Sequence, residues 1–238
     1  MLLPTYNERE NLDVILDAIL MAQPKFSILI IDDNSPDGTG AIADRRAAED
    51  SRIDVLHRPG KEGLAKAYVA GFLRGLADTR EFTHFFEMDA DFSHDPRYLG
   101  DLLGACESGA DLAVGSRYVL GGGTRGWPLS RKLLSRGGGV YARTVLGVDV
   151  KDLTAGFLCF RRSLLEQLAL NSIATSGYGF QIELKYRTLQ MDKTLKEIPI
   201  VFTERIRGTS KMSLGIAIEA LMMVWTLRKS EPVSMGDR

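Results

Sequence analysis

Asp89 and Asp91 stand one residue apart in the stretch EMDADFSHDP, directly after an apolar run at residues 82–86. Two carboxylates this close repel each other unless a positive group lies between them. A hard divalent cation such as Mg²⁺ or Mn²⁺ suits that position because it prefers oxygen ligands. The pair alone does not decide, since a chain with 18 aspartates among 238 residues contains roughly one Asp-x-Asp by chance. A solvated turn and a metal site both stay open at this point.

Two further polar clusters follow apolar segments of the chain. Residues 4–8 read PTYNE, and residues 32–39 read DDNSPDGT after the short apolar run at 26–31. In open parallel sheets, ligands bind beyond the carboxyl ends of the strands. Three such ends that converge on one edge therefore predict a pocket. None of the three clusters has the glycine spacing of a dinucleotide-binding turn or of a P-loop, which disfavours dehydrogenases and P-loop enzymes.

The segments around these clusters alternate between strand and helix patterns. Apolar spacing predicts a helix from residue 12 and further helices ending near 48, at 64–76 and at 96–107; strands are predicted at 26–31, 53–56, 82–88 and 111–115. This order predicts an α/β fold with a mostly parallel central sheet flanked by helices. We expect one domain over residues 1–228 and a flexible tail over 229–238. Only three residues precede Pro4, so the first strand looks truncated.

Composition excludes several classes of function. The formal net charge of −1 gives no basic field for nucleic acid. Cys106 and Cys159 form neither a disulfide framework nor a metal-ligand spacing, and the three scattered histidines disfavour a zinc site. Neither a signal peptide nor an apolar run of 18 residues is present. We therefore expect a cytoplasmic protein without a membrane span.

Two segments in the second half are candidates for contact with a membrane surface. Residues 131–146 form a cationic helix pattern, and residues 214–227 are strongly apolar but too short to cross a bilayer. The second segment fits either a core helix or a helix lying in the bilayer interface. In the second case Trp225, Arg228 and Lys229 stand at its polar boundary.

The order of the motifs resembles that of a known enzyme family. Besides the clusters already quoted, the chain has GLAKA at 63–67, GSRY at 115–118, Trp127 with Arg131 and Ser135, DLTAGF at 152–157, GYGFQIE at 177–183 and RGTSKM at 207–212. Together they resemble the inverting family 2 glycosyltransferases with a GT-A fold. Among these the chain is similar to the dolichyl-phosphate (polyprenyl-phosphate) mannose synthases, over about residues 3–214.

The resemblance implies a role for named residues on the sugar-nucleotide side. The nucleoside and its sugar would be bound by Pro4, Tyr6, Glu8, Asp33, Asp37, Ala65 and Ala90. Asp89 and Asp91 would hold Mg²⁺ or Mn²⁺ against the diphosphate. Ser93 stands where the family often has Gln, and either its hydroxyl or a water completes that site. Arg207 and Lys211 would lie on a loop that closes over the phosphates.

The same resemblance implies an acceptor site and a reaction. Arg117 and Arg131, supported by Ser135, would grip the phosphate of a polyprenyl lipid. The implied catalytic set is Asp89, Asp91, Arg117, Arg131 and Lys211. The implied reaction is inverting transfer of mannose from GDP-mannose to a polyprenyl or dolichyl phosphate. The protein would act peripherally on the cytoplasmic face of a membrane, with a separate membrane-anchoring subunit as a candidate partner. Alternatives are glucose transfer from UDP-glucose and a non-catalytic scaffold that binds sugar nucleotides.

Overall fold

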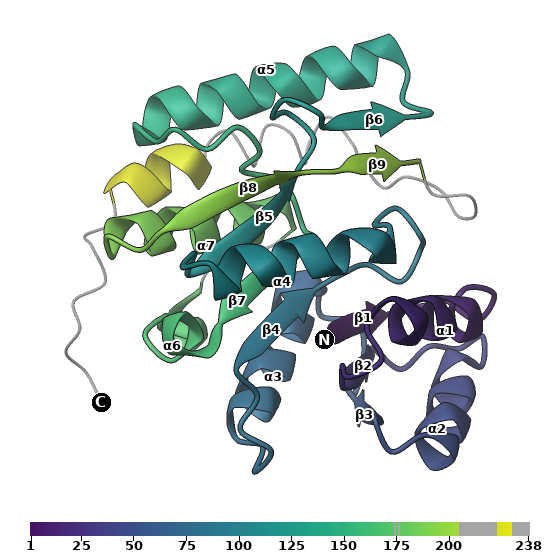
Figure 1. Cartoon of the computed structure of the whole chain (residues 1–238). Coiled ribbons are helices and arrows are strands. Elements are labelled where there is room, and N and C mark those ends of the chain that lie inside the picture. Colours follow the sequence, from purple (N-terminus) through teal and green to yellow (C-terminus); the bar gives the residue numbers. More distant parts are fainter. Residues whose placement is uncertain (174, 176, 205–222, 230–238) are drawn as a thin grey trace.

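The computed structural model describes residues 1–173, 175, 177–204 and 223–229. Its centre is a seven-stranded sheet with the order β3-β2-β1-β4-β7-β5-β8 (Figure 1). The strands are β1 (Leu2–Thr5), β2 (Ile28–Asp32), β3 (Ile53–His57), β4 (His84–Glu87), β5 (Leu112–Ser116), β7 (Leu158–Arg161) and β8 (Leu195–Pro199). Only β7 runs antiparallel to its two neighbours among these strands. The predicted α/β fold with a mostly parallel sheet is confirmed.

Helices cover both faces of this sheet. They are α1 (Leu12–Ala22), α2 (Thr39–Glu49), α3 (Leu64–Leu76), α4 (Leu99–Glu107), α5 (Leu129–Leu146), α6 (Arg162–Leu165) and α7 (Tyr178–Gln190), with 3₁₀ turns η1 (Pro96–Tyr98) and η2 (Leu170–Ser172). A second, parallel sheet pairs β6 (Gly123–Arg125) with β9 (Val201–Thr203). Figure 1 shows α5 beside this small sheet, at the opposite end of the molecule from α1 and α2.

The alternation of side chains along the strands builds two cores, one on each face. In β1, Leu3 packs with the residues of α1 and α4, whereas Leu2 packs with those of α3 and α7. In β2, Ile30 and Ile31 divide between the same two clusters. Strands buried on both faces read as continuous apolar runs, which is why residues 26–31 could be recognised in the sequence.

Pro4 lies inside β1, a strand with neighbours on both sides. The Thr5 carbonyl accepts a hydrogen bond from the Asp33 amide on the β2 side, so by alternation the Pro4 nitrogen faces β4. The registered pair between β1 and β4 is Leu2 with Glu87, before Pro4. Pro4 has no amide proton to continue the ladder to β4, and the pairing with β4 ends before it.

A third apolar cluster joins α5 and α7 to the helix at residues 223–229. Val224 and Leu227 are buried in it, whereas Trp225 is about half exposed. For these residues of the 214–227 segment, Val224 and Leu227 pack as a core helix does, and the interfacial position of Trp225 stays a prediction. Residues 214–222 and the tail beyond residue 229 lie outside the described residues. Within the described part of the chain, no helix is long and apolar enough to cross a membrane.

Candidate active site

The three polar clusters lie at one edge of the sheet. Thr5 at the end of β1 is in register with Asp32 at the end of β2, and β4 ends beside them. Each of the three following loops contains one non-glycine residue in the left-handed region, namely Asn7, Asn34 and Phe92, with φ of 61°, 57° and 61°. Such conformations are costly and gather at functional loops.

Asp32 fastens the first two loops together. Its Oδ1 accepts hydrogen bonds from the Ser35 hydroxyl at 2.6 Å and the Thr5 hydroxyl at 3.1 Å, and its Oδ2 accepts from the Ser35 amide at 3.1 Å. Ser35 Oγ in turn accepts from the Asn7 amide at 3.1 Å. Asp32 is buried, so this carboxylate positions the loops. Two adjacent aspartates look alike in the sequence, and only the fold separates the role of Asp32 from that of Asp33.

Asp37 likewise connects two loops through hydrogen bonds to its carboxylate. It accepts from the amide and hydroxyl of Thr39 at 3.0 and 2.6 Å and from the Arg9 amide at 3.1 Å. Partial burial would raise the pKa of Asp37, but these hydrogen bonds outweigh it and lower that pKa. The Thr39 hydroxyl also accepts from the Glu8 amide at 3.0 Å. Asp37 thus holds Glu8 in place beside β1.

Asp33 is buried against a basic residue that the sequence did not single out. Its Oδ1 accepts from Arg58 Nη1 at 2.5 Å, and Arg58 Nη2 donates to Glu62 at 2.9 Å. Burial raises the pKa of the Asp33 carboxyl, although Arg58 opposes the rise. Lys61 Nζ lies 4.0 Å from the centroid of the Tyr6 ring. The loop after β3 therefore adds two cations, Arg58 and Lys61, beside residues of the predicted nucleoside pocket. The basic residues of this loop were its only indication in the sequence.

The Asp89–Asp91 loop forms the third side of the site. Asp91 is buried and its Oδ1 accepts from the Ser93 amide at 3.0 Å, while Asp89 is partly exposed. His94 Nδ1 accepts from the Asp89 amide at 3.2 Å, which leaves the proton on the other ring nitrogen. His94 was not predicted as a site residue, and only its place in the MDADFSH motif pointed to it.

These residues fit a hard divalent cation. The Ser93 hydroxyl is buried and has no hydrogen-bond partner in the described structure, as expected of an oxygen that awaits a ligand. Across the described ranges, no group of three His, Cys, Asp or Glu side chains could hold an ion by itself. Two carboxylates with one hydroxyl match Mg²⁺ or Mn²⁺, which commonly take their remaining ligands from water and substrate phosphates.

A buried polar network lies beneath this loop. Glu87, two residues before Asp89, accepts from Gln181 Nε2 at 2.6 Å. Lys185, fully buried on α7, donates to the carbonyls of Ala155 and Gln181 at 2.7 and 3.1 Å. Burial raises the pKa of Glu87 and lowers the pKa of Lys185. The network ties α7 to the strand that carries the aspartate pair.

We expect Lys185→Met to destabilise the fold by about 3–5 kcal/mol, because it removes one partner from a buried network of charged groups. The free energy of unfolding, measured in urea, checks this. Lys66→Met is the matched control, since Lys66 is exposed and lies 3.8 Å from Glu62 in an ion pair; we expect a change within about 0.5 kcal/mol there. A loss below about 1 kcal/mol for Lys185→Met contradicts the prediction.

Arg117 is held by a bidentate ion pair. Its Nε and Nη2 donate to the two carboxylate oxygens of Asp152 at 2.7 and 2.6 Å, and its amide donates to Asp152 Oδ2 at 2.9 Å. Nη2 also donates to the Thr154 hydroxyl at 2.8 Å. Burial would raise the pKa of Asp152, but Arg117 outweighs it and lowers that pKa. Asp152 thus orients Arg117; its only signal in the sequence was the DLTAGF motif.

Arg131 and Ser135 project from α5 toward the same place. The Arg131 guanidinium stacks 4.0 Å from the Trp127 ring centroid, and Arg117 lies 5.4 Å from the same ring. Tyr118, next to Arg117, donates from its hydroxyl to Ser135 Oγ at 2.6 Å. The fold therefore brings together all three residues expected at the acceptor phosphate.

A row of rings connects the two halves of the site. His94 stacks on Phe157 with centroids 5.0 Å apart and meets Phe202 at 5.4 Å. Phe202 meets Trp127 at 5.5 Å, and Trp127 carries Arg131. Phe202 has no motif that marks it in the sequence, because only the pairing of β9 with β6 places it between His94 and Trp127.

The remaining predicted residues divide into two groups. Ala65 is buried in the first turn of α3, and Ala90 is buried between Asp89 and Asp91. Pro4 is partly buried in β1. Arg207 and Lys211 lie outside the described residues.

A mostly parallel sheet with an acidic pair beyond its carboxyl edge is the arrangement expected of a glycosyltransferase with a GT-A fold. The family model "Glycosyl transferase family 2" matches residues 1–169. This chain belongs to that family.

Curated relatives narrow the similarity. The chain is 48% identical over 230 residues to the polyprenol monophosphomannose synthase of Mycolicibacterium smegmatis, covering 95% of this chain and 86% of that protein. It is 47% identical to the undecaprenyl-phosphate mannosyltransferase of Micrococcus luteus, covering 94% and 90%. Identity is 35% to the dolichol-phosphate mannosyltransferase of Pyrococcus furiosus, covering 97% and 63%. The resemblance inferred from the motifs is confirmed.

Solved structures support the fold. Glucosyl-3-phosphoglycerate synthase from Mycobacterium tuberculosis, in complex with Mn²⁺, UDP and glucosyl-3-phosphoglycerate, superimposes with a TM-score of 0.69. Identity is 20%, over 95% of this chain and 78% of that one. A second structure of the same enzyme, with Mn²⁺ and UDP-glucose, gives a TM-score of 0.68 at 18% identity, over 95% and 77%. Structural neighbours of this fold thus bind a divalent metal together with a nucleotide.

Proposed function

We propose that this chain transfers mannose from GDP-mannose to a polyprenyl phosphate of the dolichyl type, with inversion, to give polyprenyl β-mannosyl phosphate. One observation carries the proposal: a continuous row of contacts links the acidic pair to the arginines. His94 binds the Asp89 amide and contacts Phe202, Phe202 contacts Trp127, and Arg131 stacks on Trp127. Two relatives with 47–48% identity, named for mannose transfer to polyprenyl lipids, support the choice of substrates.

The acceptor needs no general base. A phosphate monoester is at least singly anionic at neutral pH, so its oxygen can attack the anomeric carbon directly. The new bond joins that oxygen to the carbon, while the bond from the carbon to the diphosphate breaks and its electron pair leaves with the nucleotide. Arg117 and Arg131 lower the repulsion between the two phosphate groups and orient the attacking oxygen.

The donor is bound at the other half of the site. Asp89 and Asp91, with Ser93 as a third candidate, would hold Mg²⁺ or Mn²⁺. Such an ion, when bound, offsets the charge that grows on the leaving diphosphate. We propose that Tyr6 and Asp33 line the nucleoside pocket, together with Pro4, Glu8, Asp37, Ala65 and Ala90. Arg207 and Lys211, outside the described residues, are proposed to face the phosphates.

Binding of free nucleotides tests the donor. We expect GDP to bind more tightly than UDP, and each to bind at least tenfold more tightly with Mg²⁺ than with EDTA, because the carboxylates alone repel a diphosphate. Isothermal titration with GDP, UDP, GDP-mannose and UDP-glucose measures both effects. A preference for UDP and UDP-glucose would favour glucose transfer instead.

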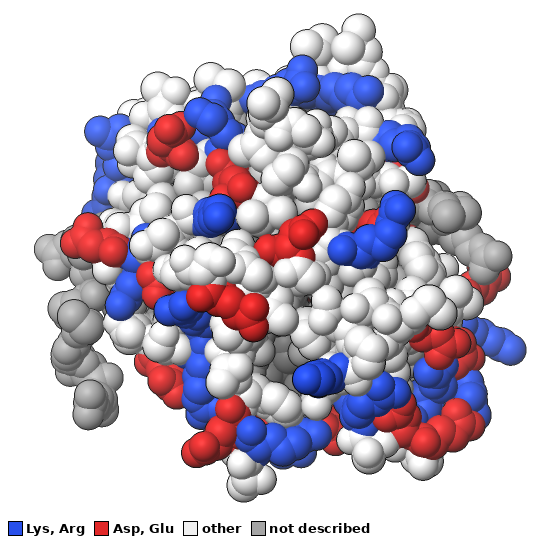
Figure 2. Space-filling model, viewed as in Figure 1, with Lys and Arg blue, Asp and Glu red and all other residues white. Residues whose placement is uncertain are grey.

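One face of α5 suits a membrane surface. Leu129 and Leu133 are 71% and 62% exposed, and Arg136 and Val140 continue the same face at helical spacing. The helix has four basic residues and no acidic one. Figure 2, viewed as in Figure 1, shows Lys and Arg side chains among uncharged ones along the edge where α5 lies. Exposed leucines beside cations are typical of interfacial helices.

We therefore propose that the protein binds the cytoplasmic face of a membrane through α5, where a lipid acceptor can enter with its phosphate near Arg131. We propose a separate membrane-anchoring subunit as the partner that would hold the protein at this surface. Leu129→Glu with Leu133→Glu is expected to abolish flotation with anionic liposomes, because it replaces apolar contact by charge repulsion.

The matched control changes two exposed apolar residues on α1, Val14→Glu with Met21→Glu, at the other end of the molecule. We expect this variant to float as the unchanged protein does. If the unchanged protein floats with neither anionic nor neutral liposomes, the proposal that α5 alone binds the membrane is wrong and a partner is required.

A further inference from the structure

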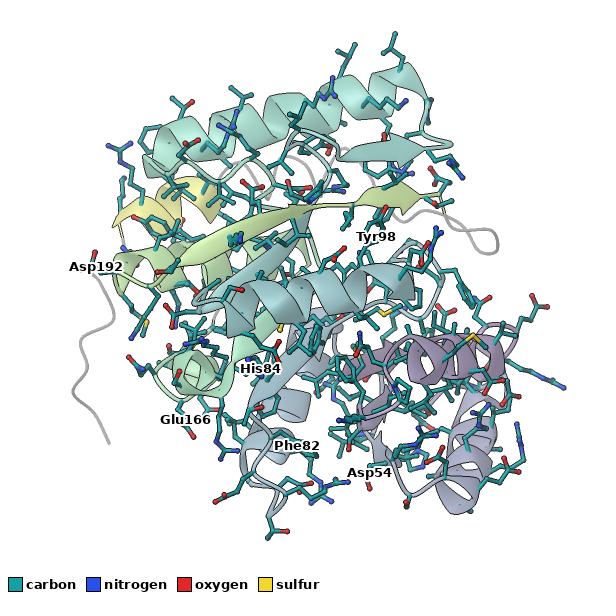
Figure 3. All side chains as sticks on the ribbon, in the orientation of Figure 1. Asp54, Phe82, His84, Tyr98, Glu166 and Asp192 are labelled. Atoms are coloured by element: carbon teal, nitrogen blue, oxygen red, sulfur yellow. The ribbon has the colours of Figure 1, made fainter. Side chains whose placement is uncertain are left out.

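Glu204 is placed beside Arg131 by the small sheet. It directly follows β9, and its amide donates to the Arg125 carbonyl at 2.9 Å. Gly126 has φ +83°, and a Cβ there would lie 2.9 Å from the Glu204 Cβ. Tyr98, which Figure 3 shows between α4 and β9, accepts from the Val201 amide at 3.2 Å. Glu204 is therefore hydrogen-bonded to Arg125 and packed against Gly126, at the end of a strand whose first residue is bound by Tyr98.

The carboxylate of Glu204 forms an ion pair with Arg131, the arginine expected to bind the acceptor phosphate. Its Oε1 accepts from Arg131 Nη1 at 2.5 Å. Three buried polar atoms of this group have no hydrogen-bond partner in the described structure: Arg131 Nε, Trp127 Nε1 and Glu204 Oε2. Two donors and an acceptor thus remain unsatisfied on neighbouring side chains, which is costly in a completed site. A group with more acceptor oxygens than one carboxylate would satisfy both donors.

The contrast with Asp152 shows that Glu204 is held less firmly. Both oxygens of Asp152 accept from Arg117, and its side chain is fully buried. Glu204 uses one oxygen on Arg131, and its side chain is 33% exposed. Breaking a buried bidentate pair is costly, whereas a partly exposed single contact can be exchanged at little cost.

We propose that Glu204 is a specificity-determining residue of the acceptor site, because its carboxylate occupies Arg131 until a phosphate monoester displaces it. The inference rests on the proposed function. A monoester carries a charge of about −1.5 to −2 at neutral pH and three acceptor oxygens, so it can replace the carboxylate. A singly charged diester gains less on Arg131, so at low concentration it leaves the contact between Glu204 and Arg131 in place. The carboxylate weakens the binding of every anion by a similar factor, and only an anion that binds Arg131 tightly still displaces it.

Trp127 supplies a direct readout for this exchange. The chain has two tryptophans, so Trp225→Phe leaves Trp127 as the single fluorophore, stacked on Arg131. We would titrate inorganic phosphate and dimethyl phosphate into this protein and into the same protein with Glu204→Gln. We expect Glu204→Gln to raise the affinity for inorganic phosphate about tenfold and the affinity for dimethyl phosphate by a similar factor, since a neutral amide no longer competes for Arg131. Glu204→Asp, with a shorter side chain, is expected to fall between.

The control is Glu166→Gln, because Glu166 forms an exposed ion pair with Arg162 on α6, away from β9 (Figure 3). It should change neither affinity. Unchanged or weaker phosphate binding in Glu204→Gln, with a melting temperature like that of the parent protein, overturns the inference. Arg131→Gln separates the two proposals: if it leaves phosphate binding intact, the acceptor half of the proposed function fails as well. If it abolishes binding while Glu204→Gln has no effect, only the role of Glu204 fails.

Discussion

Asp91→Asn is expected to lower turnover by at least 10²–10³ while the fold stays intact. Losing one preorganised electrostatic group at a developing charge typically costs this much. Asparagine keeps the shape of the side chain and an acceptor oxygen for the Ser93 amide, which Asp91 Oδ1 binds at 3.0 Å. The change therefore removes charge at the proposed metal site with little effect on the loop.

Initial rates with purified protein, GDP-mannose, a polyprenyl phosphate and Mg²⁺ measure the effect. Asp95→Asn is the matched control, because Asp95 lies in the same loop but caps η1 and pairs with the exposed Arg97. We expect its rate to stay within about threefold of the parent, since exposed ion pairs contribute little. Turnover near the parent value in Asp91→Asn would show that this carboxylate holds no essential ion.

Arg117→Gln is expected to reduce both stability and activity. Asp152 would remain buried without its cation, which costs about 3–5 kcal/mol in a buried ion pair. Turnover should fall about 10²–10³-fold because the acceptor phosphate loses an oriented donor. The double variant Arg117→Gln with Asp152→Asn separates the two effects, since it removes both charges. Its stability should largely return while its activity does not.

Urea unfolding and initial rates on the same preparations give both quantities. Arg97→Gln is the control, because the Arg97 side chain is 85% exposed and forms its ion pair with Asp95; we expect about 0.5 kcal/mol or less there. If the double variant regains both stability and turnover, Arg117 serves the fold alone and a different residue binds the acceptor.

The sequence predicts the elements whose signals are local. The helix expected at 64–76 is α3, with the same bounds, because apolar spacing and the preceding loop define both ends. The cationic helix expected at 131–146 begins two residues earlier, at Leu129, since Pro128 can precede a helix without breaking it. The strands at 26–31 and 82–88 were expected longer than β2 and β4, because apolar residues continue beyond the paired ones.

The parts that the sequence could not predict depend on long-range pairing. β6 and β9 have three residues each and pair across more than seventy positions of the chain, so neither has a periodic signal of its own. The partners of the two acceptor arginines lie 35 and 73 residues away, in Asp152 and Glu204. Only the fold shows that Arg117 pairs with both oxygens of a buried carboxylate, whereas Arg131 contacts one oxygen of a partly exposed carboxylate.

The identity and stereochemistry of the lipid product test the central claim most directly. Purified protein would be incubated with GDP-mannose, a polyprenyl phosphate and MgCl₂, and the lipid fraction would be analysed by mass spectrometry and NMR of the anomeric centre. We expect a polyprenyl monophosphate that has gained one hexose, linked in the β configuration, together with GDP. An α-linked product, or no product in the presence of liposomes with any of GDP-mannose, UDP-glucose and their relatives, would contradict it.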